Sequence, residues 1–471
     1  MEKYKKLLKN ILYFFAGNLG SKILIFILVP YYTHVLSTSE YGTADLVTTT
    51  AMLIIPIITL SVTEAVFRFS MDKNTNMKNL YSNGLFIVII GNLFFGICAL
   101  FLKNIVEIRN YILYLQMLIF VDSIYNITAQ FVRGKEQTGV YAISGVVQTC
   151  ALVIFNLVFL LGFKLGVQGY LLAMIVSYLI ALIYVFIAGN IFSYIGKPNF
   201  HLLQHMLKYS IPMIPSGLSW WGMSSADKYI ISSCIGAGAN GIYLVAQKIP
   251  TILNVFITVF QQAWQISAVD EKENGNNFKK FSSQIFCYLQ IALFLCSSLL
   301  ICILKPLYSI WVDSAYYLAW ESTPLLLIAT VFSCLSQFMT TNYIVSKKTL
   351  GNLKVTVAGC ASNIVLNLIL IPKFGMIAAA FTTFIGYLII FLMTVYDLRK
   401  IITIEFSKGK LFFSTVLLAL QAIMLYLPLY FWIVVEFLLF LLHVFIYRRE
   451  LVYLIIVFNN ILRRNNFLRD K

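Results

Sequence analysis

Residues 11–36 read ILYFFAGNLGSKILIFILVPYYTHVL, a run whose only Lys, Arg, Asp or Glu is Lys22. A helix needs about 20 apolar residues to cross the hydrocarbon of a bilayer, so this run is long enough. It follows the basic segment MEKYKKLLKN at residues 1–10 and has no small-residue cleavage site behind it. We therefore expect a retained transmembrane helix that starts on the cytoplasmic side.

Thirteen further apolar runs follow the first one. They are separated by short polar clusters with Gly or Pro, such as STSEYG at 37–42 and IGAGANG at 235–241. The expected spans are 44–68, 81–102, 111–132, 138–163, 167–192, 209–235, 239–267, 281–304, 318–345, 351–371, 375–398, 411–427 and 430–447. The sequence thus predicts an all-α membrane protein of about 14 transmembrane helices.

The composition requires a bilayer as solvent. Of the 471 residues, 60% are hydrophobic and 11% are charged, whereas a soluble domain carries about 25% charged residues. The net charge of +16 comes from Lys and Arg at the ends of apolar runs rather than on one face, which argues against nucleic acid as a partner. Because catalytic, metal-ligand and nucleotide-binding motifs are not evident, we expect neither an enzyme nor a bound cofactor.

The distribution of Lys and Arg sets the orientation, because positively charged loops resist translocation. With the N-terminus inside, 22 of these residues fall in cytoplasmic segments. The outside receives only Lys103, Arg109, Lys164, Lys305 and Lys373. We therefore expect both termini on the cytoplasmic side, with residues 450–463 as an interfacial helix on the inner leaflet.

An internal repeat relates the two halves of the chain at an offset of about 200 residues. It matches Gly42 with Gly241, Asn156 with Asn367, Gly166 with Gly375 and Tyr178 with Tyr387. Since each copy has six helices, an even number, the copies should be parallel and related by a pseudo-twofold axis along the membrane normal. The expected domains are a bundle at 1–200, a second bundle at 201–400, and helices 13 and 14 with the interfacial helix at 401–471.

Ionisable residues at membrane depth are the main functional candidates. A charge at a helix centre costs about 2.5 to 3.5 kcal/mol on insertion scales, so each needs a partner, a wet cavity or a function. The basic candidates are Lys22, Arg68, Lys228 and Lys248. The acidic candidates are Glu64, Asp122, Asp227 and Glu436, with Glu321 nearer the outer surface.

Two pairs of these residues are close in sequence, which bears on the partners that they can have. Glu64 and Arg68 stand at i and i+4 and can form an ion pair, or Arg68 can reach the inner headgroups instead. Asp227 and Lys228 are adjacent and point about 100° apart on a helix, so we expect them to have separate partners.

The lysines on the leading helices of the two halves suggest a site for an anion. Lys22, Lys228 and Lys248 either line one aqueous cavity or form interhelical ion pairs. The candidate ion-pair partners are Glu64, Asp122 and Asp227, which are also the candidates for coupling to Na⁺ or H⁺. A cationic cavity with a low-dielectric wall attracts phosphate or pyrophosphate, and Arg68 can add bidentate contacts at the inner mouth.

Three stretches of this chain resemble the Wzx-type oligosaccharide flippases of the multidrug, oligosaccharidyl-lipid and polysaccharide exporter superfamily. They are NLGSKILIFILVPYYTHVLSTSEYGTADL at 18–46, TEAVFRF at 63–69 and SSADKYIISSCIGAGANGIYLVAQKIPTILNVFITVFQQAWQ at 224–265. The resemblance assigns functional positions to Arg68, Asp227, Lys228 and Lys248, whereas Lys22 rests on the charge argument.

The resemblance implies a flippase of the bacterial cytoplasmic membrane with two bundles that open alternately to either side. Its substrate would be an undecaprenyl-pyrophosphate-linked oligosaccharide for O-antigen, capsule or exopolysaccharide assembly. The expected partners are this lipid-linked oligosaccharide, membrane lipids and other polysaccharide-assembly proteins, with the chain itself a monomer. Helices 13 and 14 resemble the pair that forms a groove for the lipid tail in the peptidoglycan lipid flippase of the same superfamily.

Two other functions compete with this one. A multidrug exporter of the same superfamily would share the fold but needs acidic residues in its cavity, where the first helix offers Lys22. A membrane-embedded glycan polymerase would need large outside loops, and the longest here, WVDSAYYLAWES at 311–322, is short.

Overall fold

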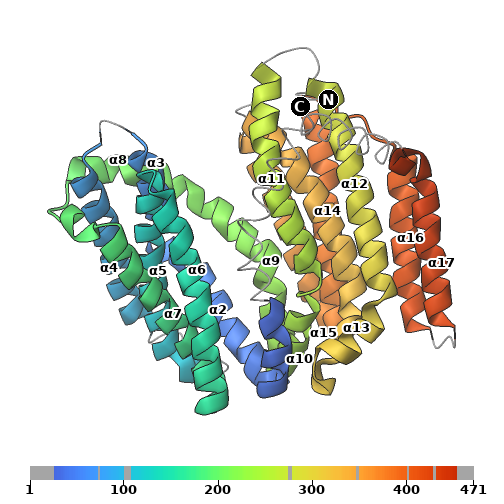
Figure 1. Cartoon of the computed structure of the whole chain (residues 1–471), viewed down its shortest axis with the longest axis horizontal. Coiled ribbons are helices and arrows are strands. Elements are labelled where there is room, and N and C mark those ends of the chain that lie inside the picture. Colours follow the sequence, from blue (N-terminus) through green and yellow to red (C-terminus); the bar gives the residue numbers. More distant parts are fainter. Residues whose placement is uncertain are drawn as a thin grey trace, which may run out of the picture. The chain divides into compact units, whose positions relative to one another are not determined.

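The structure is a computed structural model that describes residues 26–72, 75–99, 108–273, 278–345, 349–399, 402–427 and 431–452. All regular structure in these residues is helical, which confirms the predicted all-α membrane fold (Figure 1). The chain divides into two compact units, whose described parts are residues 26–244 and 245–452. The predicted division at residues 200 and 400 stays a prediction.

The first unit contains the helices of the first half and the start of the second. They are α2 (Thr38–Ile58), α3 (Val62–Ser70), α4 (Met77–Cys98), α5 (Ile112–Gly134), α6 (Thr138–Asn156), α7 (Gly166–Ala188), α8 (Phe200–Ser210), α9 (Ile214–Cys234) and most of α10 (Ala237–Ala246). Residues 26–35 are also helical and form the end of the predicted first span, the rest of which lies outside the described residues.

The second unit contains the remaining helices. They are α11 (Pro250–Glu273), α12 (Phe278–Cys302), α13 (Leu304–Trp311), α14 (Ala319–Val345), α15 (Thr349–Leu398), α16 (Lys408–Tyr426) and α17 (Trp432–Ile446). The predicted interfacial helix at 450–463 lies largely outside the described residues.

Among the described residues, nine helices are long and apolar enough to cross a membrane, or ten if α10 and α11 form one broken span. The protein is therefore a multi-pass membrane protein. One of the nine is α15, which combines the predicted spans 351–371 and 375–398 and is bent at Gly375, where φ is 67°. The predicted total of about 14 stays a prediction.

Two predicted spans are each divided into two helices. The span 44–68 becomes α2 and α3, with Leu60 and Ser61 in the left-handed region between them. The span 239–267 becomes α10 and α11, with the break just before Pro250. Proline lacks a backbone donor and disfavours a helical residue before it, which explains the second break.

Repeat-equivalent glycines both have a positive φ. Gly166 opens α7 with φ 54°, and Gly375 marks the bend in α15 with φ 67°. A left-handed φ is easily adopted only by glycine, and these two positions are aligned by the sequence repeat. The shared positive φ supports the predicted repeat.

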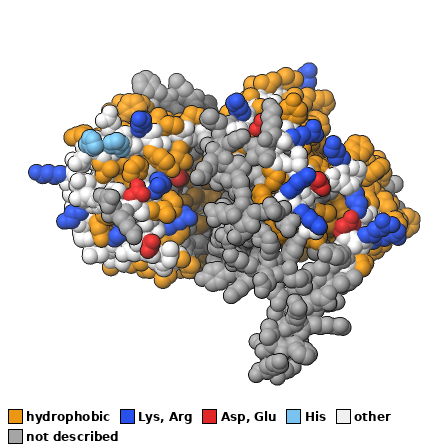
Figure 2. Space-filling model, turned by 90° about the horizontal axis from the view of Figure 1, so that it is seen from above, with side chains coloured by type: hydrophobic (Ala, Val, Ile, Leu, Met, Phe, Trp, Pro, Cys, Tyr) orange, Lys and Arg blue, Asp and Glu red, His pale blue; other side chains and the backbone are white. Residues whose placement is uncertain are grey.

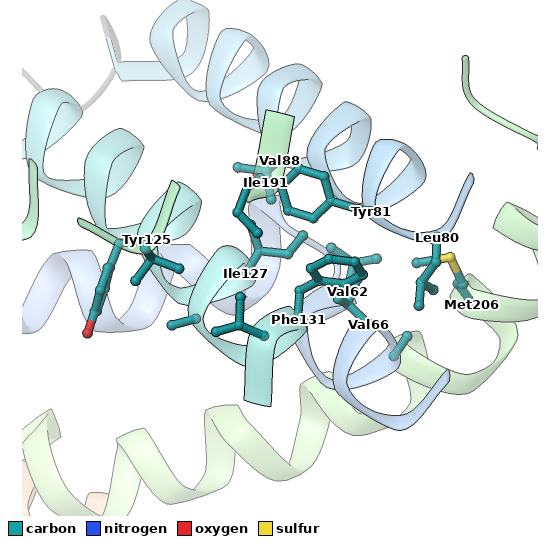
Figure 3. Close-up of a cluster of buried hydrophobic side chains, with 14 of the residues drawn as sticks. Val62, Val66, Leu80, Tyr81, Val88, Tyr125, Ile127, Phe131, Ile191 and Met206 are labelled. Atoms are coloured by element: carbon teal, nitrogen blue, oxygen red, sulfur yellow. The ribbon is translucent and has the colours of Figure 1, made fainter. Parts of the chain in front are cut away.

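The core of the first unit is built from α3, α4, α5, α7 and α8. Figure 3 shows its buried side chains, among them Tyr81, Ile127 and Phe131, packed around Val62 and Val66 of α3. A second buried cluster, which includes Ala44 and Val47, packs α2, the helix that carries part of the site, against α5 and α7.

One end of the helices carries many basic side chains. Figure 2 looks onto the end of the first unit at which α8 lies, and Lys and Arg are scattered over its described surface. The helix α8 begins at Phe200, in the segment expected to be a loop between the predicted spans 167–192 and 209–235. Asn199 caps it by accepting a hydrogen bond from the Leu202 amide. This end is the one that the sequence predicts to be cytoplasmic.

Candidate functional site

Five buried polar residues on α2, α9 and α10 form one connected cluster, which we call the interhelical charge cluster. Its members are Asp45 of α2, Asp227 and Lys228 of α9, and Asn240 and Tyr243 of α10. All five residues are buried, so water screens their interactions little. All five belong to the first unit.

An ion pair joins α9 to α2. Lys228 Nζ lies 3.0 Å from Asp45 Oδ1, and the two side chains are 10% and 9% exposed. Asn240 Nδ2 donates to Asp45 Oδ2 at 3.3 Å and to the Gly42 carbonyl at 2.9 Å. Asp45 therefore ties three helices together.

Asp227 has partners of its own. The Tyr243 hydroxyl donates to Asp227 Oδ2 at 2.7 Å, and the backbone amide of Lys228 donates to Oδ1 at 2.9 Å. The prediction that Asp227 and Lys228 have separate partners is thus confirmed. The partner of Lys228 was not foreseen, because the candidates were Glu64, Asp122 and Asp227.

The charges of this cluster do not match a cationic site. Two carboxylates and one ammonium give it one net negative charge when all three are ionised. In this conformation Lys228 is neutralised by Asp45, so Lys228 by itself does not make the surroundings cationic. The predicted role of Lys228 in binding an anion therefore requires this ion pair to open.

The backbones of α2 and α10 touch at two glycines. A side chain at Gly42 would overlap the Ala237 carbonyl, and one at Gly241 would overlap the Thr38 carbonyl. The contact is reciprocal, because Ala237 and Gly241 are the repeat equivalents of Thr38 and Gly42. Glycine is needed here for close approach.

A second set of hydrogen bonds joins α9 to α2. Trp221 Nε1 donates to the Thr49 carbonyl at 2.9 Å, and the Tyr229 hydroxyl donates to the Leu46 carbonyl at 3.4 Å. Tyr229 also bonds the Thr50 hydroxyl. The contact between α9 and α2 is therefore polar along several turns.

Arg68 lies apart from the charge cluster, at the C-terminal end of α3. Its guanidinium pairs with Asp72 at 2.9 Å, and the two side chains are 52% and 45% exposed. Glu64 is exposed on the same helix. Arg68 therefore pairs with Asp72, four residues after it, and not with Glu64, four residues before it.

The remaining predicted residues are dispersed. Asp122 of α5 is half-buried and accepts a hydrogen bond from Asn126. Lys248 is half-buried in the turn between α10 and α11, where its amide bonds the Val245 carbonyl. Lys22 lies outside the described residues. In the part of the chain that the structure describes, no group of three or more His, Cys, Asp or Glu could hold a metal ion.

Asp45, Asn240 and Tyr243 were not identified from the sequence, and Asp45 is the charged member among them. The predicted second span began at residue 44, which placed Asp45 at the membrane surface. The structure begins α2 at Thr38, because Ser37 and Glu40 form a capping box with both reciprocal hydrogen bonds. The S-x-x-E pattern at 37–40 was the signal that would have moved Asp45 two turns into the helix.

The sequence family follows from a match over more than half of the chain. Residues 7–266 match the family described as polysaccharide biosynthesis protein. The chain belongs to this family. A membrane protein of Methanocaldococcus jannaschii, MJ1375, is 22% identical to this polysaccharide biosynthesis protein over 429 residues, or 84% of this chain and 98% of that one. A second from the same organism, MJ1068, is 39% identical over 57 residues, only 12% of this chain and 11% of that protein.

Solved structures share the fold of this polysaccharide biosynthesis protein. The lipid II flippase MurJ in an inward closed conformation superposes with a TM-score of 0.69 at 14% identity, covering 93% of this chain and 100% of that one. An inward-facing MATE family multidrug resistance transporter of the MOP superfamily gives 0.63 at 14% identity, covering 82% and 95%. A MOP superfamily transporter from Pyrococcus furiosus gives 0.57 at 12% identity, covering 84% and 95%. At these identities the likeness establishes the fold alone.

Proposed function

We propose that this protein is a flippase for undecaprenyl-pyrophosphate-linked oligosaccharide repeat units. It moves them from the inner to the outer leaflet of the bacterial cytoplasmic membrane by alternating access, and so supplies O-antigen, capsule or exopolysaccharide assembly. The observation that carries the proposal is membership of the polysaccharide biosynthesis protein family together with a MOP superfamily fold. In this role the chain is a transporter and not an enzyme.

The pyrophosphate is bound by the basic residues predicted at membrane depth, which are Lys22, Arg68, Lys228 and Lys248. Lysine binds phosphate as a compact charge, and the guanidinium of Arg68 can offer two parallel donors. Two of the four are paired with carboxylates in this structure, Lys228 with Asp45 and Arg68 with Asp72. Substrate binding therefore exchanges a carboxylate partner for a phosphate oxygen at these positions.

The charge cluster is suited to holding the outer side closed. With the N-terminus inside, α2 and α10 both begin at the outer side of the membrane, where their glycines meet. Opening to the outside would separate these backbones and break the hydrogen bonds from Asn240 to Gly42 and Asp45. The pyrophosphate that draws Lys228 away from Asp45 would weaken the same closure.

The membrane potential favours this direction of transport. An inside-negative potential assists the outward movement of an anion by about 2.3 kcal/mol per charge per 100 mV. The polyprenyl tail remains in lipid while the headgroup crosses between the helices.

The test is a flipping assay with the purified full-length chain in lipid vesicles. An undecaprenyl-pyrophosphate-linked oligosaccharide is placed in both leaflets, and a membrane-impermeant glycosidase reports the fraction that becomes accessible from one side. We expect the wild type and Lys208→Ala, which changes an exposed lysine at the end of α8, to equilibrate the lipid. Lys22→Ala and Arg68→Ala should lose this activity at normal protein levels, and activity equal to wild type in both would reject the binding assignment.

Export of organic cations is the second candidate function. It is favoured by the net negative charge of Asp45, Asp227 and Lys228 taken together. Both carboxylates already have hydrogen-bond donors, which leaves less attraction for a foreign cation. Increased susceptibility of a deletion strain to cationic drugs, with normal surface glycan, would favour export over flipping.

A further inference from the structure

A second buried polar core lies between α12, α16 and α17, far along the chain from the charge cluster. The last two of these helices are the predicted helices 13 and 14, which stand outside the repeat. Five of the buried side chains are Ser298, Ser414, Gln421, Glu436 and His443, each 0% exposed. Polar groups in a membrane protein are costly to bury, so this core calls for a function or a complete set of partners.

Hydrogen bonds connect the inner part of this core. The Tyr447 hydroxyl accepts from Gln290 Nε2 at 2.9 Å and from the Ser414 hydroxyl at 2.8 Å. His443 Nε2 lies 3.2 Å from the Ser414 carbonyl, to which it can only donate. At the end beyond Tyr447, Lys410 pairs with Glu450.

His443 is placed so that it can accommodate an added proton. Its Nδ1 lies 3.2 Å from the Ser298 hydroxyl and 3.3 Å from the Leu439 carbonyl. The Ser298 hydroxyl donates to Gln421 Oε1 at 2.8 Å, and in that orientation its oxygen can accept from a protonated Nδ1. When the ring is neutral, the same hydroxyl can turn and donate to Nδ1. Ser298 thus offers a satisfied arrangement for both states of the ring.

Glu436 is the unsatisfied member of the core. It is 0% exposed, and neither of its carboxylate oxygens has a hydrogen-bond partner among the described residues. Gln421 Nε2 donates to the Glu436 backbone carbonyl at 3.4 Å, and it is the polar group that also acts on the carboxyl. An isolated ionised carboxylate is far more expensive to bury than a neutral acid.

The charged and titratable neighbours of Glu436 do not complete an ion pair. Cys302 of α12 and Lys305 of α13 interact with it electrostatically. Lys305 Nζ instead donates to the Leu425 carbonyl at 2.6 Å and lies 4.4 Å from the centre of the Trp320 ring. On α17 itself, His443 follows Glu436 by seven residues, which is two turns or about 10.5 Å on the same face.

We propose that the core of α12, α16 and α17 is a proton-binding site, with the Glu436 carboxyl as the group that takes up and releases the proton. Uptake forms an O–H bond on one Glu436 oxygen and removes one negative charge from the core. Release to water leaves a carboxylate, which the Lys305 ammonium stabilises through space and to which the polar groups of His443, Ser298 and Gln421 contribute their dipoles. The two helices outside the repeat thereby acquire a role in proton binding, which goes beyond the binding of the transported lipid.

Infrared spectroscopy of the full-length protein in lipid bilayers tests this directly. A buried neutral carboxylic acid gives a C=O stretch that carboxylates lack. We expect such a band at neutral pH that disappears reversibly at alkaline pH and is lost completely in Glu436→Gln. Glu405→Gln, which changes an exposed, paired carboxylate, should leave the band intact. A band that persists in Glu436→Gln, or its absence from the wild type at neutral pH, would overturn the proposal.

Two further variants keep the result interpretable. Glu436→Asp should retain a band at a shifted frequency, which covers the case in which Glu436→Gln does not accumulate. His443→Gln should move the pH at which the band disappears, whereas a purely structural histidine would leave that pH unchanged. Because Gln imitates the neutral acid, Glu436→Gln should unfold at the same temperature as the wild type. A marked loss of thermal stability in this variant would mean that the folded protein needs the ionised group, and would contradict the proposal.

Discussion

Replacing Lys228 by methionine tests the charge cluster most sharply. The change keeps the aliphatic stem but leaves Asp45 buried, with Asn240 at 3.3 Å as its remaining side-chain donor. Removing one partner of a buried ion pair costs about 3 to 5 kcal/mol, because the other charge loses its compensation. With both side chains about one-tenth exposed, screening by water reduces this value little.

Asp45→Asn in the same background removes the stranded charge. We expect the double variant Asp45→Asn, Lys228→Met to recover most of the lost stability, since an ion pair replaced by neutral groups is often nearly neutral overall. The measurement is chemical unfolding of the purified chain in lipid, read as a double-mutant cycle. Asp72→Asn is the matched control, because its ion pair with Arg68 is exposed and worth about 0 to 1 kcal/mol.

A flipping assay on the double variant then distinguishes a structural role of Lys228 from a functional one. If Lys228 binds pyrophosphate, the double variant should be stable and still fail to flip the lipid-linked oligosaccharide. Restored flipping would reduce Lys228 to a structural residue. A double variant as unstable as Lys228→Met alone would refute the coupling between the two side chains.

Three further predictions concern the same helices and one loop. Gly42→Val should destabilise the protein and impair flipping, because its side chain would overlap a carbonyl of α10; Gly145→Val, where a Cβ meets nothing within 4 Å, should match the wild type in unfolding. Asn240→Ala should lower the unfolding free energy by about 1 to 3 kcal/mol, since buried acceptors on α2 lose a donor. The charge and hydrogen bond of Lys279 lower the pKa of Glu405. This pair stabilises the fold above the ordinary glutamate pKa, and the effect is lost as pH falls through the lowered value. Glu405→Gln should therefore flatten the acid side of a plot of thermal stability against pH.

The positions of the helices were largely predictable from the sequence. The run 318–345 became α14 at Ala319–Val345, and the gap near residue 373 became the bend at Gly375. These features are local, because a bilayer requires a continuous apolar stretch and a glycine allows the left-handed turn. The alignment of Gly166 with Gly375 was also readable, since both halves keep a glycine where φ is positive.

The breaks within spans were less predictable. Leu60 and Ser61 take left-handed conformations that neither residue type favours, so packing rather than local preference sets the division between α2 and α3. The capping box of Ser37 and Glu40 starts α2 at Thr38 and so places Asp45 two turns inside the helix, deeper than the predicted span did. An apolar run marks where a helix can lie in lipid, but a cap decides where it starts.

The pairing of side chains could not be read from spacing. Arg68 has a carboxylate four residues away on each side, Glu64 and Asp72, and the structure pairs it with Asp72. Lys228 finds Asp45 183 residues away in the chain, through a contact between helices that no local pattern encodes. Neutral partners such as Asn240 and Tyr243 are harder still to foresee, because their role depends wholly on which helices meet.

The crossing of α2 and α10 limits how this gene can diverge. The backbone of α10 occupies the space where a side chain at Gly42 would stand, and the backbone of α2 does the same at Gly241. A larger residue at either position would collide with the backbone of the other helix, so the two glycines constrain each other's substitution.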